Sequence, residues 1–212
     1  MVSGTSGVAC VFCIGRNYVE HARELANAVP EKPVVFIKPA SCLVRPGKGI
    51  HFPKHGRELQ HEVEIVVRVG REGRARTEEE ALLFVSDLTV GLDLTLRDIQ
   101  KELKQKGLPW EIAKAFEQSA PIGDFKPYDG SLDLKNIRFG CRVNGIERQR
   151  GNTGEMIFSI GELLVHLSTI WMLRPGDLVY TGTPSGVGSL KIGDTIEVES
   201  DPIGLFSWSI VE

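Results

Sequence analysis

The apolar residues of this chain gather in short stretches that are rich in Val, Ile and Phe and are bounded by Gly, Pro or Asn. β-Branched and aromatic residues between such turn formers favour strands over helices. Asn144-Gly145 separates two of these stretches and is a pair that the type I′ hairpin turn favours, which indicates antiparallel pairing. The predicted strands are residues 8–14, 34–38, 62–69, 137–143, 177–181, 195–199 and 205–211.

The clearest helix signal begins at Ser159, which with Glu162 forms the Ser-x-x-Glu pattern that satisfies free backbone amides of a first turn. Apolar residues then recur at helical spacing until Pro175-Gly176. We expect Trp171 and Met172 to belong to the core and not to a cofactor site. The predicted buried stripe consists of Leu163, Leu164, Leu167, Ile170 and Trp171.

The other predicted helices are shorter. Thr77 and Glu80 repeat the start signal, a helix over 96–106 is ended by Gly107, and a short helix is expected near Val19. Strands outnumber helices and do not alternate with them. This order predicts an α+β fold with a curved, mostly antiparallel or mixed sheet.

Composition and charge narrow the class of protein. With 212 residues, of which 42% are hydrophobic, the chain can bury one sizeable core, so we expect a single domain over residues 1–212. Its 25 basic and 28 acidic residues give a formal charge of −3 and form no basic stripe. No apolar run approaches the roughly 20 residues of a membrane helix. Neither nucleic acid nor a membrane is an expected partner.

The cysteines indicate a reducing compartment. No Lys or Arg precedes the apolar stretch at 8–14, so we expect a first strand there, no secretion signal, free thiols and a cytoplasmic location. Cys10 and Cys13 have the spacing of half a zinc or redox site, but no second pair or nearby His accompanies them. We interpret them as strand residues. The chain has four cysteines, Cys10, Cys13, Cys42 and Cys141.

Glu62 and Glu64 are the first residues that suggest chemistry. They are two apart on a predicted strand, so both carboxylates project from one face. A solvated strand face is the plain alternative. The residues that follow are continuously apolar, which predicts a strand covered on both faces, and carboxylates are seldom buried without a partner. The pair therefore favours a bound cation.

Asp93 is a third carboxylate in apolar surroundings, within Val90-Gly-Leu-Asp-Leu-Thr95 and just before the predicted helix. A turn or helix-start role is its alternative. Three carboxylates without His or Cys as further ligands favour a hard ion such as Mg²⁺ or Mn²⁺ over zinc. The sequence thus predicts a Mg²⁺ or Mn²⁺ site at Glu62, Glu64 and Asp93.

Six motifs follow one another along nearly the whole chain. They are Cys13-Ile-Gly-Arg-Asn-Tyr18, Phe36-Ile-Lys-Pro39, His61-Glu-Val-Glu64, Gly91-Leu-Asp-Leu-Thr-Leu-Arg-Asp98, Lys106-Gly-Leu-Pro-Trp110 and Tyr180-Thr-Gly-Thr-Pro-Ser-Gly-Val-Gly188. In this order they resemble the fumarylacetoacetate hydrolase family, above all its acylpyruvate hydrolase and oxaloacetate decarboxylase branch. The resemblance implies a mixed sheet rolled into a barrel-like body with few peripheral helices, and a homodimer.

The resemblance also implies roles that spacing leaves open. It matches Glu62, Glu64 and Asp93 to metal ligands and Lys114 to a lysine near the metal. Without it, Lys114 would be expected in solvent, as most lysines are.

A pair of residues three apart, His21 and Glu24, is matched by the resemblance to a catalytic dyad. His21 would activate water as general base, and Glu24 would hold the imidazole in the working tautomer. Their segment would close over the ligand as a lid. A surface pair on a short helix is the alternative.

The resemblance places a further group of residues at the substrate. The turn at 181–183 would present hydroxyls and backbone amides to a substrate carboxylate. Its glycines do not form a phosphate loop, because the Lys-Ser/Thr ending is absent. The expected substrate-binding residues are Arg16, Gln100, Thr181, Gly182 and Thr183.

The implied function is metal-dependent cleavage of a C–C bond in a small 2-oxo acid through a metal-stabilised pyruvate enolate. Acylpyruvate hydrolysis and oxaloacetate decarboxylation both fit. One alternative is an isomerase or decarboxylase of 2-hydroxyhepta-2,4-diene-1,7-dioate-type compounds in aromatic catabolism. Another is a catalytically silent metal- or acid-binding protein, which the presence of His21, Glu24 and Lys114 argues against.

Overall fold

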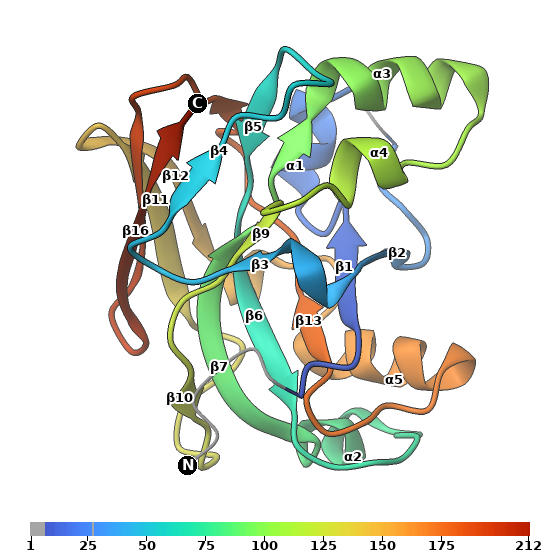
Figure 1. Ribbon diagram of the computed structural model, residues 1–212. Helices are drawn as coiled ribbons and strands as arrows, with labels where there is room; N and C mark the ends of the chain where they lie inside the picture. The colour runs from blue at the N-terminus through green and yellow to red at the C-terminus, as the bar shows by residue number, and fades with distance from the viewer. Residues whose placement is uncertain (1–6, 27) are drawn as a thin grey trace.

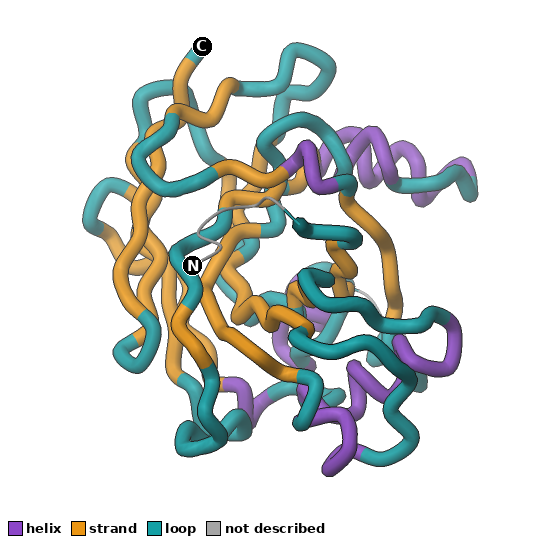
Figure 2. Tube along the Cα trace, turned by 60° about the horizontal axis from the view of Figure 1, so that its bottom comes forward, coloured by secondary structure: helices purple, strands orange, loops and turns teal. Residues whose placement is uncertain are grey.

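The computed structural model describes residues 7–26 and 28–212. Its strands wrap around one another into a rolled body, and its helices lie around the periphery (Figure 1, Figure 2). The predicted α+β class with mixed sheets is therefore confirmed. No helix in the described residues is long and apolar enough to cross a membrane.

A six-stranded mixed sheet forms the centre of the molecule, with the order β10-β7-β6-β13-β1-β2. Among its described strands, only β1 and β13 pair in parallel. The residues of β6 show why the sheet is central: alternate side chains enter the main hydrophobic core, while Val66 packs into a second cluster on the other face. The strands are β1 (Val11–Gly15), β2 (Val34–Lys38), β6 (Val63–Val69), β7 (Val85–Leu92), β10 (Lys126–Pro127) and β13 (Leu178–Tyr180).

A second, five-stranded sheet packs beside the first, with the order β12-β11-β15-β16-β4. Asn144 and Gly145 both have positive φ, 52° and 77°, as the predicted type I′ turn between β11 and β12 requires. Its strands are β4 (Gly49–His51), β11 (Arg138–Val143), β12 (Ile146–Asn152), β15 (Thr195–Ser200) and β16 (Gly204–Val211).

A three-stranded ladder, with the order β14-β5-β8, lies next to the candidate site, and β3 and β9 form a separate two-stranded ladder. The chain runs from β5 into β6 with a break at Glu62, and from β7 into β8 with a break at residues 93–94. β5 pairs with β8, as β6 pairs with β7. Between the two breaks, the backbone N–H of Asp93 donates to the carbonyl of Glu62 at 2.8 Å. Both residues therefore lie where regular pairing is interrupted. The short strands are β3 (Leu43–Val44), β5 (Leu59–His61), β8 (Thr95–Leu96), β9 (Ala120–Pro121) and β14 (Gly188–Ser189).

The helices follow the predicted start and stop signals. The side chain of Ser159 accepts from the Glu162 amide at 3.1 Å, and Glu162 accepts from the Ser159 amide at 2.6 Å. Gly107 ends α3 in the left-handed conformation, at φ 63°. The helices are α1 (Val19–Glu24), α2 (Glu78–Leu82), α3 (Arg97–Lys106), α4 (Glu111–Lys114) and α5 (Ile160–Ile170), with 3₁₀ turns at Ala40–Cys42 and Thr153–Glu155.

The end of α5 differs from the prediction. Trp171 is extended, at φ −115° and ψ 151°, so that Leu173 can pair with Gly73 through two backbone hydrogen bonds. Met172 is 48% exposed and Ile170 is 51% exposed, so placing them in the core was wrong. Trp171 is partly buried against the main core.

The strand predictions also needed correction. The eight-residue strand β7 was not predicted as one, because Ser, Asp, Thr and Gly interrupt its apolar residues. The first strand begins at Val11 and not at residue 8. Glu62 lies outside β6, which starts at Val63.

The central sheet leaves little space around Gly91 on β7. A Cβ at this position would lie 2.6 Å from the Pro121 carbonyl oxygen, a backbone atom. We expect Gly91→Ala to lower the free energy of unfolding by about 1–3 kcal/mol, measured by urea denaturation. Gly15→Ala is the control, because its nearest neighbours are 3.8 Å away. Equal stability of the two variants would contradict the close approach.

Candidate metal centre and active site

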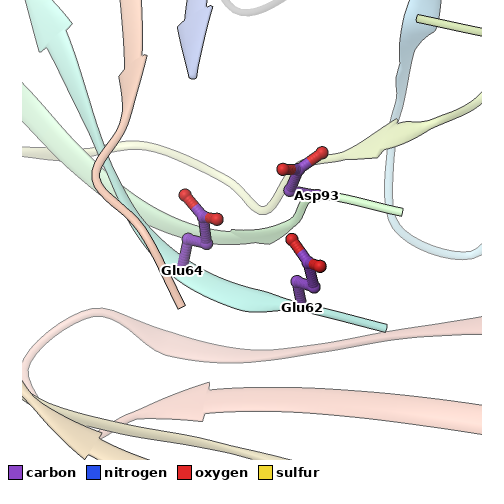
Figure 3. Close-up of side chains that lie close together, drawn as sticks. All are labelled: Glu62, Glu64 and Asp93. Atoms are coloured by element: carbon purple, nitrogen blue, oxygen red, sulfur yellow. The ribbon is translucent and has the colours of Figure 1, made fainter. Parts of the chain in front are cut away.

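Three buried carboxylates meet at the break between the strand ladders (Figure 3). Glu64 projects from β6, while Glu62 and Asp93 lie in the interruptions before β6 and after β7. Each offers an oxygen within 4.8 Å of the others, and their exposed fractions are 5%, 1% and 1% in the order Glu62, Glu64, Asp93. The structure thus brings together the three residues predicted as metal ligands.

Glu62 is neutralised by two cations. Lys114 donates to its Oε2 at 2.7 Å, and Arg97 donates to its Oε1. Burial by itself would raise the pKa of Glu62, but the charges of Lys114 and Arg97 hold it well below the usual range. Glu62 is therefore ionised at neutral pH.

Asp93 shares one of these cations and leaves one oxygen incompletely satisfied. Lys114 donates to its Oδ2 at 2.6 Å. Lys38 Nζ lies 2.8 Å from Oδ1, but donates its hydrogen bonds to the carbonyls of Leu94 and Ser119. Oδ1 is buried and accepts no hydrogen bond from the described residues.

Glu64 forms no ion pair among the described residues. Its Oε2 accepts a hydrogen bond of 2.7 Å from the Gly182 amide. Burial, reinforced by the charges of Asp93 and Glu62, raises the pKa of Glu64 well above its ordinary value. A cation between the carboxylates would relieve this repulsion and satisfy the Asp93 oxygen that accepts no hydrogen bond. The donor set is all oxygen, which suits Mg²⁺ or Mn²⁺.

The predicted dyad is formed on α1. His21 is buried, and its Nδ1 lies 3.2 Å from Glu24 Oε2. The other carboxylate oxygen of Glu24 accepts from the Gly186 amide at 3.1 Å. Asn17, just before the helix, donates to the carbonyls of Phe158 and Thr181. These bonds hold α1 against the loop that follows β13 and against the segment that precedes α5.

One small cavity joins the dyad to the carboxylates. Its volume is about 30 Å³, room for about one or two water molecules. The Gln100 side chain accepts from Arg97 at 2.6 Å, and its amide nitrogen donates to no atom of the described residues. Asp93 does not line the cavity, but its carboxylate lies within 4.8 Å of those of Glu62 and Glu64, which do. The predicted site residues that line the cavity itself are Arg16, His21, Glu62, Glu64, Gln100, Lys114 and Thr183.

Two predicted substrate-binding residues do not line the cavity. The Thr181 hydroxyl donates to the Ile65 carbonyl at 2.8 Å, and the Gly182 amide is bonded to Glu64. Their contact with substrate stays a prediction. In this structure both tie the turn after β13 to β6.

Several important side chains were given no role by the sequence reasoning. Lys38 and Arg97 lie in two of the six motifs, at 36–39 and 91–98. The order of residues in a motif does not show which carboxylate a cation will contact in the fold. Gln149 on β12 accepts from His61 and the Val63 amide at 2.9 and 3.0 Å, and donates to Thr183 at 2.8 Å. It links the two sheets beside the site.

The chain is similar to known proteins along most of its length. The family model "Fumarylacetoacetate (FAA) hydrolase C-terminal" matches residues 10–211. The chain is 42% identical over 187 residues to the mitochondrial oxaloacetate tautomerase FAHD1 of Bos taurus, covering 88% of this chain and 85% of that protein. It is also 42% identical over 188 residues to the mitochondrial oxaloacetate decarboxylase of Dictyostelium discoideum, covering 88% and 86%.

Solved structures agree as well. The crystal structure of fumarylpyruvate hydrolase from Pseudomonas aeruginosa, in complex with Mn²⁺ and pyruvate, matches with a TM-score of 0.92 at 38% identity, covering 96% of this chain and 90% of that one. The sequence, the fold and the arrangement of acidic residues lead to one conclusion. The chain belongs to the fumarylacetoacetate hydrolase family.

Proposed function

We propose that this protein is a Mg²⁺- or Mn²⁺-dependent enzyme that cleaves a C–C bond in a small 2-oxo acid, by acylpyruvate hydrolysis, oxaloacetate decarboxylation or both. One observation carries the proposal: an incompletely neutralised carboxylate triad and a formed His–Glu dyad meet at one cavity. The names of the relatives from Dictyostelium discoideum and Pseudomonas aeruginosa support this choice of reactions.

Glu62, Glu64 and Asp93 would hold the metal. When bound, the ion would supply a positive charge that orients the 2-oxo acid and stabilises negative charge on its oxygen. Lys114 lies between Glu62 and Asp93 and adds a fixed positive charge at the same place. The free amide of Gln100 and the hydroxyl of Thr183 offer polar contacts in the cavity.

In the hydrolysis, His21 acts as general base. Its Nδ1 is engaged by Glu24, so Nε2 is left to take a proton from water. The resulting hydroxide adds to the acyl carbon, the C3–C4 bond breaks, and its electron pair stays on the pyruvate fragment, which is then protonated. The products are a carboxylic acid and pyruvate. Decarboxylation breaks the same bond but needs no attacking water.

Access to the cavity requires movement. A space for one or two waters cannot admit a 2-oxo acid while α1 is held by Glu24 and Gly186. We propose that α1 opens and closes as a lid. A homodimer also remains a proposal.

Metal binding is tested by thermal unfolding with Mn²⁺. At one hundred times its Kd, Mn²⁺ should stabilise the protein by about 2.7 kcal/mol, and so raise the Tm by about 5 °C or more. Glu64→Gln should keep the metal-free Tm, because Glu64 has no cationic partner among the described residues, and lose most of this increase. Glu117→Gln, at an exposed carboxylate, is the control. If Mn²⁺ raised the Tm of Glu64→Gln as much as that of the unsubstituted protein, Glu64 would not be a metal ligand.

The dyad is tested by steady-state kinetics with acetylpyruvate and oxaloacetate, with and without chelator. His21→Ala should lower kcat for acetylpyruvate hydrolysis by about 10²–10⁴-fold and retain the Mn²⁺-dependent increase in Tm. Decarboxylation should fall less, since no water is activated. His166→Ala serves as control. Unchanged hydrolysis in His21→Ala would exclude the dyad, and undiminished turnover after complete metal removal would exclude the metal dependence.

A second candidate function is enol–keto isomerisation without C–C cleavage. The name of the bovine relative, oxaloacetate tautomerase, favours it, and a base at His21 could move a proton between carbon and oxygen. NMR should show pyruvate from acetylpyruvate if cleavage is the activity. Conversion of enol to keto oxaloacetate, or of 2-hydroxyhepta-2,4-diene-1,7-dioate to its keto isomer, with no cleavage of any substrate, would favour the isomerase.

A further inference from the structure

Two cations in the cavity have no anionic partner among the described residues. Arg97 and Lys114 line it too, but both are bound to the metal-ligand carboxylates. Arg16 and Lys104 are half-buried, and neither forms an ion pair with a described residue. Positive charges that are partly removed from water without a partner favour an anionic ligand.

Lys104 lines the cavity about one helical turn beyond Gln100. It follows Gln100 by four residues on α3, so the two side chains share one face of the helix, about 6 Å apart along its axis. Gln100 is bonded to Arg97, which binds Glu62. Lys104 is therefore one turn farther from the metal ligands, and its Nζ lies 5.1 Å from the centre of the Trp110 ring.

The surroundings of Lys104 are electropositive. Burial, together with the charges of Arg16, Arg97 and Lys114, lowers the pKa of Lys104 to about 8, despite an opposing effect of Glu62. A carboxylate placed between Lys104 and Arg16 would offset this repulsion.

We propose that Lys104, assisted by Arg16, binds the second carboxylate of a dicarboxylic 2-oxo acid whose 2-oxo end lies at the triad. Lys104 is then a specificity-determining residue. The inference rests on the proposed function and narrows its substrate class.

A neighbouring groove is the competing place for the substrate tail. It has a volume of about 280 Å³ and shares Phe36, Trp110 and Lys114 with the site cavity. Its other walls are mostly apolar, and its further charged residue is Glu111, which would repel a carboxylate. The groove suits an uncharged tail, so the charge of the tail separates the two locations.

Lys104→Met is tested by kinetics with fumarylpyruvate, which has a carboxylate tail, and acetylpyruvate, which has a methyl tail. We expect kcat/KM for fumarylpyruvate to fall by about tenfold or more, mainly through KM, and that for acetylpyruvate to change less than about twofold. Lys104→Arg should recover part of the loss. Lys101→Met is the matched control, because Lys101 is exposed on the same helix and lies 3.5 Å from Glu58. Equal losses with both substrates, or none with either, would overturn the proposal.

A binding measurement keeps this inference separate from the proposed reaction. In calorimetry with Mn²⁺ present, 2-oxoglutarate should bind more tightly than 2-oxopentanoate, and Lys104→Met should remove that difference. This result can hold even if the protein cleaves no substrate, in which case only the proposed function fails. Equal affinity of the native protein for both acids would falsify the role of Lys104.

Discussion

The burial of three carboxylates at one point is the constraint on which this structure depends. An isolated buried charge costs several kcal/mol, so Glu62, Glu64 and Asp93 can be buried together only if cations come with them. Lys38 comes from β2, Arg97 from α3 and Lys114 from α4. The site therefore requires that elements distant in sequence be in place together. It cannot form before these elements have packed against one another.

The three carboxylates are not neutralised equally. Glu62 and Asp93 are held by cations, whereas Glu64 is held by a backbone amide. Protein cations thus preserve the shape of the cluster without saturating it. The same turn that supplies the amide to Glu64 continues to Gly186, which holds Glu24 of the dyad. The carboxylate triad and α1 are therefore connected through one loop.

Local patterns predicted much of the fold because local forces decide those features. The turn at Asn144-Gly145 and the cap at Ser159 depend on residues adjacent in sequence. The end of α5 does not, because Leu173 leaves the helix to pair with Gly73, which lies far from it along the chain. Strand β7 escaped prediction because its polar residues and Gly91 are accommodated by neighbours that periodicity does not reveal.

The sequence by itself determined the three carboxylates and the ordered motifs, since these are matters of residue type and spacing. The residues of the dyad followed only from the family resemblance that the motifs carry. Only the tertiary structure decided that Lys38 and Arg97 meet the triad, that Thr181 turns its hydroxyl to β6, and that Lys104 faces the cavity. The physical reason is the separation along the chain of the residues that interact. Spacing along a strand or helix fixes which side chains share a face, whereas the partner of a buried charge is chosen by contacts between segments far apart in the chain.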